Sequence, residues 1–85
     1  MSVRKDIREQ LPEGATVFDN YAYDDSIIGV TTDGRVVYSY EKMIEELAVE
    51  EGLTREEARD WIEYNTIKAL PYIENAPVIV EEIIV

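Results

Sequence analysis

The sequence predicts an α+β fold in which a small, mainly antiparallel sheet is covered by helices. Two β-branched segments flank an Asp-Gly turn within residues 26–40, which is typical of a hairpin. Two segments with helical apolar spacing follow at 41–51 and 54–69, and a β-branched stretch ends the chain. With 85 residues, the chain is expected to form a single domain, residues 1–85.

The N-terminal part is predicted to hold a short helix, a short strand and a loop. The helix is expected over residues 3–11, because apolar side chains recur there every four positions behind a possible N-cap. These residues are Val3, Ile7 and Leu11, with Ser2 as the cap. Residues 15–19 are expected to form a strand, and residues 20–25, which show no clear period, a loop.

The hairpin has the strongest local signal. Asp33-Gly34 suits a two-residue type I′ turn, in which both central positions need a positive φ. With that turn, Val30 lies opposite Val37 and Gly29 lies opposite Tyr38. Apolar side chains occur on both faces of this ribbon, so cover on both faces is expected.

The first long helix is predicted over residues 41–51. One apolar stripe runs along it, made of Met43, Ile44, Leu47 and Ala48. Gly52 then stands where a left-handed C-cap is wanted, and Leu53 can fold back on the last turn.

The second long helix is predicted over residues 54–69. Thr54 and Glu57 match the spacing of a capping box at its start, and Pro71 stops it. Its buried face is expected to hold Ala58, Trp61, Ile62, Asn65 and Ala69. Trp61 is therefore expected to pack in the core rather than to bind a partner.

The C-terminal segment is predicted to be a strand. Residues 77–80 and 83–85 are rich in β-branched side chains and are separated by Glu81 and Glu82. Pairing with the hairpin would bury their apolar groups and complete the sheet.

The composition argues against an enzyme. The chain lacks cysteine and histidine, which removes the thiol nucleophile, the zinc-thiolate site and the usual general base. Its serines have no histidine to activate them, and its four glycines do not form a phosphate-binding loop. We therefore expect no catalytic residue and no cofactor. Since no apolar run is long enough for a membrane span or a signal peptide, a soluble cytoplasmic protein is expected.

The net charge is the most unusual feature of the chain. Nineteen acidic side chains against eight basic ones give −11 at pH 7. Residues 1–10 carry +1, so residues 11–85 carry −12. Residues 41–63 alone hold nine acids and three bases. Such a field repels nucleic acid and anionic membranes and attracts basic protein surfaces.

The segment 19–25 mixes acids with tyrosines. Asp19, Asn20, Asp24 and Asp25 are oxygen ligands, but they lack the alternating spacing and central glycine of a calcium loop, so no metal site is expected. For Tyr21 and Tyr23 two interpretations stay open, namely core packing and a protein-interaction surface.

Three stretches resemble a group of short acidic proteins of bacterial and prophage genomes. They are residues 23–38 (YDDSIIGVTTDGRVVY), 40–47 (YEKMIEEL) and 58–72 (ARDWIEYNTIKALPY). The group implies no catalytic motif. In size and acidity the chain is also similar to anti-CRISPR proteins, several of which mimic DNA, and this second likeness implies an inhibitor.

The leading hypothesis is a non-enzymatic inhibitor of the anti-CRISPR kind that presents DNA-like charge. Its partner would be a basic nucleic-acid-binding protein, such as a subunit of a CRISPR effector complex, and not nucleic acid or a membrane. The expected partner-binding residues are Glu45, Glu46, Glu50, Glu51, Glu56, Asp60 and Glu63, extended by Asp24, Asp25, Tyr21 and Tyr23.

Two alternatives remain. The first is a regulatory adaptor that binds a protein through the hairpin and the Tyr21/Tyr23 loop. The second is a carboxylate hydrolase that needs a divalent ion. The sequence is compatible with a monomer or a small homo-oligomer.

Overall fold

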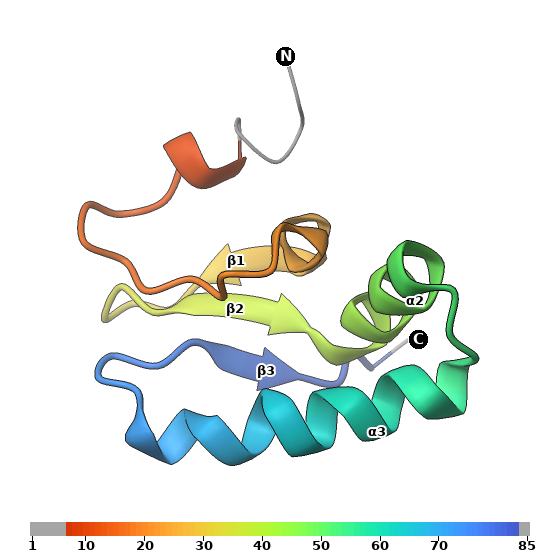
Figure 1. Ribbon diagram of the computed structural model, residues 1–85. Coiled ribbons are helices and arrows are strands. Elements are labelled where there is room, and N and C mark those ends of the chain that lie inside the picture. Colours follow the sequence, from red (N-terminus) through yellow and green to blue (C-terminus); the bar gives the residue numbers. More distant parts are fainter. Residues whose placement is uncertain (1–6, 84–85) are drawn as a thin grey trace.

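The computed structural model describes residues 7–83 and shows a three-stranded sheet with helices packed against it (Figure 1). The elements, in chain order, are the 3₁₀ helix η1 (Tyr21–Ser26), β1 (Ile27–Val30), β2 (Val36–Ser39), α2 (Tyr40–Glu51), α3 (Arg55–Asn65), the 3₁₀ helix η2 (Ile67–Tyr72) and β3 (Val78–Val80). The predicted α+β class, the hairpin and the two main helices are confirmed, and so is the C-terminal strand over residues 78–80. The predicted extension of this strand over residues 83–85 is wrong at Ile83, which is 90% exposed and outside any strand, whereas residues 84 and 85 lie outside the described residues. Of the predicted N-terminal helix, residues 7–9 are helical, whereas Ser2 and Val3 lie outside the described residues.

The sheet is mixed, with the strand order β1-β2-β3. β1 pairs with β2 in the antiparallel sense, and β3 pairs with β2 in the parallel sense. The predicted pairing of the C-terminal strand is therefore confirmed. Parallel neighbours need a long crossover connection, and α2, α3 and η2, which lie between β2 and β3, provide it.

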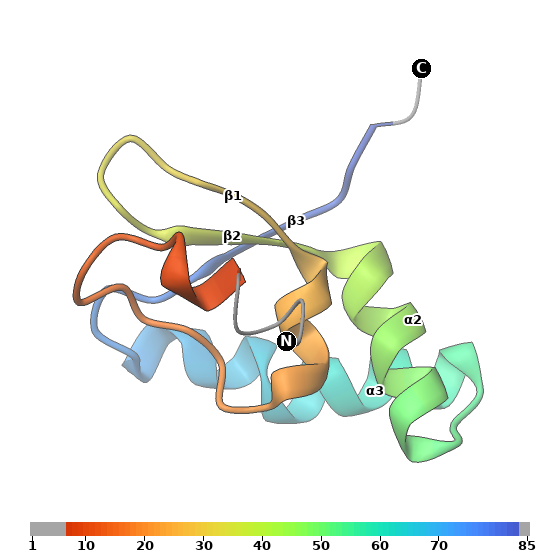
Figure 2. The same ribbon diagram turned by 90° about the horizontal axis from the view of Figure 1, so that it is seen from above.

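The helices lie on one side of this sheet, as the view from above shows (Figure 2). The core between the two layers draws side chains from both. Its buried members are Phe18, Tyr23, Val36, Tyr38, Met43, Ile44, Leu47, Ala58 and Ile62. The cover that we expected on both faces of the hairpin is thus present on one, and Ile28 and Val30 remain exposed.

The hairpin turn differs from the prediction. Only Gly34 has a positive φ, at 87°, and Val30 pairs with Val36 instead of Val37. The Gly34 N–H donates to the Thr31 carbonyl at 3.0 Å, and the Thr31 N–H donates to the Arg35 carbonyl at 2.7 Å. This is the three-residue loop in which a type I turn precedes a left-handed glycine. The extra loop residue and a bulge between Ile27 and Gly29 shift the predicted register.

The predicted strand at 15–19 and the predicted loop at 20–25 are both wrong. Phe18 uses its backbone groups for side-chain partners: its N–H donates to the Tyr38 hydroxyl (3.1 Å), and its carbonyl accepts from Arg8 Nη2 (3.1 Å). These bonds replace a sheet ladder. Asn20 then caps η1 by accepting from the Ala22 N–H at 3.0 Å, which starts a helical turn where we expected none.

The predicted caps of the long helices are confirmed. Gly52 takes the left-handed conformation (φ 66°), and the Leu53 N–H returns to the Ala48 carbonyl at 2.9 Å. Thr54 and Glu57 form the reciprocal capping box of α3. The second helix is shorter than predicted, because α3 ends at Asn65 and the chain tightens into η2, which contains Pro71.

Candidate acidic interface

The acidic side chains of α2 and α3 lie on the sides of these helices that point away from the core. In α2 the buried residues are Met43, Ile44 and Leu47, and in α3 they are Ala58 and Ile62. The helical period therefore turns the glutamates outward. We call the predicted set the acidic helical surface, which consists of Glu45, Glu46, Glu50, Glu51, Glu56, Asp60 and Glu63. All are exposed except Glu46, which is half-buried.

Arg55 neutralises part of this surface. Its guanidinium contacts Glu41 and lies 4.0 Å from Glu45, so the first turn of α3 is tied to the first turns of α2. Both partners are about half exposed, and pairs of this kind contribute little to stability. Their main effect is to lower the negative charge at this end of α2.

Most of the remaining carboxylates keep their charge available. Within residues 7–83, Glu46, Glu51, Glu56 and Asp60 make no ion pair. Glu63 accepts a hydrogen bond from the Tyr40 hydroxyl at 2.6 Å, which fixes the position of its side chain. The acidic helical surface therefore remains strongly anionic in the folded chain.

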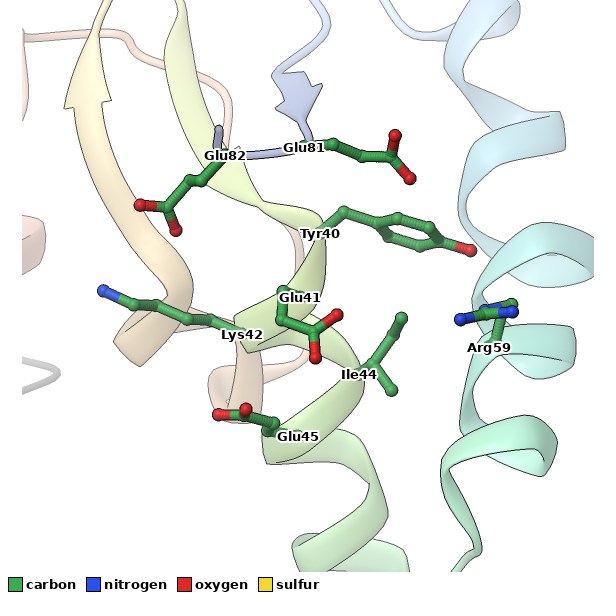
Figure 3. Close-up of a pocket in the computed structure, with 8 residues that line it drawn as sticks. All are labelled: Tyr40, Glu41, Lys42, Ile44, Glu45, Arg59, Glu81 and Glu82. Atoms are coloured by element: carbon green, nitrogen blue, oxygen red, sulfur yellow. The ribbon is translucent and has the colours of Figure 1, made fainter. Parts of the chain in front are cut away.

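An open cleft of about 560 Å³ lies beside this surface, between the start of α2, α3 and the chain that follows β3 (Figure 3). Its lining includes Glu41, Glu45, Glu81 and Glu82, opposed by Lys42 and Arg59. Tyr40 reaches across it toward α3. Partial burial and the hydrogen bond to Glu63 raise the pKa of Tyr40 to about 12, so its hydroxyl stays protonated at neutral pH. Such a lining suits the binding of cations better than nucleophilic chemistry.

The structure removes two predicted contact residues from the surface. Asp24 is fully buried and receives two bonds from Arg8, at 2.6 Å from Nε and 3.0 Å from Nη2. Tyr23 is 1% exposed and packs edge-on against Phe18. The 3₁₀ turn points both side chains inward, so neither can reach a partner in this fold.

The other two residues of this segment stay accessible. Tyr21 is 58% exposed, and the Arg8 guanidinium lies 4.3 Å from the centre of its ring. Asp25 is half-buried. Of the two interpretations, core packing therefore applies to Tyr23, whereas Tyr21 lies on the surface and stays available for an interaction.

Sequence reasoning missed an aromatic feature of α3. Trp61, which we expected in the core, is 44% exposed, and Asn65 is exposed as well. Tyr64 is 69% exposed. The buried stripe of α3 runs through Ala58 and Ile62 and continues to Thr66, so Trp61 lies at its margin. The sequence contained a signal for this arrangement, because Ala58, Ile62 and Thr66 recur every four residues and form a narrower buried stripe than the one we predicted.

Within residues 7–83 no three acidic side chains converge to hold a metal ion, and no helix has the length and apolarity to cross a membrane. Comparison of the chain with protein-family models, with curated proteins and with solved structures finds no match.

Proposed function

We propose that this chain is a non-enzymatic inhibitor that binds the basic, nucleic-acid-binding surface of another protein in place of DNA. The observation that carries the proposal is the acidic helical surface: carboxylates on two adjacent helices, among which Glu46, Glu51, Glu56 and Asp60 make no ion pair within the described residues. The similarity in character to anti-CRISPR proteins makes a CRISPR effector subunit the first partner to test.

The spacing of these carboxylates supports the proposal. Residues four apart on a helix are separated by about 6 Å along its axis. Phosphates of one DNA strand recur about every 3.4 Å. Two neighbouring helices, each with a carboxylate row, therefore present a charge density of the same order as a nucleic-acid backbone. A site built from lysines and arginines for phosphate contacts can accept such rows.

The adaptor alternative has lost part of its support. It relied on a loop with Tyr21 and Tyr23 both available, and Tyr23 is in the core. The hairpin edge and Tyr21 remain exposed, but no described feature there matches the charge of the acidic helical surface.

The experiment that tests the proposal is affinity capture from the lysate of a bacterium that carries a CRISPR system, with and without competing duplex DNA. We expect a DNA-binding protein to be captured and to be released by the duplex. Its affinity should fall at least about tenfold between 50 and 200 mM salt, because several ionic contacts are made at once. Capture that duplex DNA does not reduce, or that salt does not weaken, would contradict the proposal.

The variant Glu46→Lys with Glu50→Lys tests which charges act. Both positions lie off the apolar stripe of α2, so the fold should persist, and we expect a loss of at least about tenfold in affinity. The matched control is Glu9→Lys with Glu13→Lys, which changes the net charge equally at exposed positions outside the two helices. If both pairs of substitutions lower the affinity equally, the binding depends on net charge alone and not on the acidic helical surface.

A further inference from the structure

The exposed rings of α3 are the strongest feature that the proposed function leaves unused. Trp61 and Tyr64 are 44% and 69% exposed. Because they are three residues apart, they are neighbours on the helix surface. The fully buried residues of this helix are Ala58 and Ile62; Tyr64 points away from them, and Trp61 lies at the margin of their stripe with part of its ring exposed.

Each of these rings has a carboxylate one turn earlier on the same helix. Glu57 precedes Trp61 by four residues, and Asp60 precedes Tyr64 by four residues. Side chains with this spacing have Cβ atoms about 5–6 Å apart. Both acids are exposed, and one oxygen of Glu57 also accepts the Thr54 N–H of the capping box at 2.9 Å. We call Glu57, Asp60, Trp61 and Tyr64 together the outer face of α3.

A cation already occupies one of these rings within the chain. The Lys68 Nζ atom lies 4.3 Å from the centre of the Tyr64 ring. The contact shows that the Tyr64 ring can hold a cation at the surface without displacing any core residue. An arginine of a partner would replace Lys68 on that face or stack on the opposite face of the ring, since Tyr64 is 69% exposed.

We propose that the outer face of α3 binds arginine side chains of the basic partner, and this inference rests on the proposed function. A guanidinium is planar and weakly hydrated, so it stacks on an aromatic ring and pairs with a carboxylate at once. A lysine ammonium is a compact, strongly hydrated charge and gains less from the ring. Arginine is also a common phosphate-contacting residue of DNA-binding surfaces, which matches the partner class.

The test uses nona-arginine and nona-lysine as probes of equal charge. Trp61 is the only tryptophan of the chain, so its fluorescence reports directly on the outer face of α3. We expect nona-arginine to shift the Trp61 emission and to bind about threefold to tenfold more tightly than nona-lysine. Equal affinities, or binding that leaves the emission unchanged, would overturn the inference.

Variants of Tyr64 separate the ring from general charge attraction. Tyr64→Ala should weaken nona-arginine binding about threefold to fivefold, the range expected for an exposed cation–π contact. Tyr64→Phe keeps the ring and should bind like the wild type. Tyr72→Ala is the matched control, since Tyr72 is 90% exposed but lies on η2, and it should have no effect. Wild-type affinity for Tyr64→Ala would refute the arginine site.

The same variants distinguish the two proposals in the capture experiment. If Glu46→Lys with Glu50→Lys releases the DNA-binding partner and Tyr64→Ala does not, the arginine site is wrong and the proposed function stands. If nona-arginine binds as expected but duplex DNA does not release any protein that the chain captures, the arginine site stands and the proposed function is wrong.

Discussion

Removal of the Arg8 side chain should destabilise the fold strongly, because it takes away the counter-charge that the buried Asp24 carboxylate has within residues 7–83. The Asp24 side chain is 0% exposed and that of Arg8 is 27% exposed. Arg8 donates to both carboxylate oxygens and to the Phe18 carbonyl. Asp24 lies in η1, so this pair joins the N-terminal helical turn to the segment that packs on α2.

The magnitude follows from the burial. Loss of one partner of a fully buried ion pair costs about 3–5 kcal/mol. The partial exposure of Arg8 allows water to approach the carboxylate after truncation, so we expect about 2–3 kcal/mol for Arg8→Ala. A chain of this length has a free energy of unfolding of about 4–13 kcal/mol. The variant should therefore lose a large part of its stability, with a fall in Tm of about 10–20 °C.

Urea unfolding followed by circular dichroism measures this effect. Arg59→Ala is the control, because Arg59 is exposed and makes no ion pair within residues 7–83, and it should stay within about 0.5 kcal/mol of the wild type. In Asp24→Asn with Arg8→Ala, the loss should be at least about 1 kcal/mol smaller than the sum of the two single losses. An Arg8→Ala variant within about 0.5 kcal/mol of the wild type would refute the reasoning.

Four further predictions concern local contacts. Thr54→Ala should cost about 1 kcal/mol by urea unfolding, since it removes the N-cap of α3. The Thr54 backbone and hydroxyl hydrogen bonds lower the pKa of Glu57, so the stability that this carboxylate contributes should be present above the usual glutamate pKa and be lost as pH falls through the lowered one. The difference in stability between the wild type and Glu57→Gln should therefore shrink from pH 6 to pH 3, and a difference that does not change with pH would contradict this. Tyr40 should ionise near pH 12 in an ultraviolet titration, and Glu63→Gln should move its pKa toward 10, because the raised value depends in part on that carboxylate. Gly52→Ala should cost about 1 kcal/mol in Tm-derived stability, since φ at this position is 66° and a Cβ is strained there; an unchanged Tm would show that the C-cap can rearrange.

Local hydrogen-bonded motifs were the most predictable part of the fold. The Gly52 cap and the Thr54–Glu57 capping box depend on residues within a few positions of one another, and both are present as expected. The apolar stripe of α2 was equally clear. The hairpin was placed correctly, but its register was not, because a two-residue and a three-residue loop both satisfy an Asp-Gly pair and differ by one position in pairing.

The composition of the acidic helical surface could also be predicted, because helical periodicity sorts charged from apolar residues. The ion pairs of these helices could not be predicted from the sequence, since Arg55 contacts Glu41 only after α2 and α3 have packed together. The same holds for Trp61, whose place at the margin of the buried stripe depends on how α3 is rotated against the core.

Sequence information alone sufficed for the amphipathic helices, their caps and the large excess of carboxylates on two helix faces, because these properties depend on neighbours in the chain. The accessibility of Asp24 and Tyr23, the exposure of Trp61 and the parallel direction of β3 required the folded chain. Each of these depends on contacts between residues far apart in sequence, such as Arg8 with Asp24 and β2 with β3. Burial is a property of the packed whole, so tertiary contacts decide which of the acidic and aromatic side chains can meet a partner.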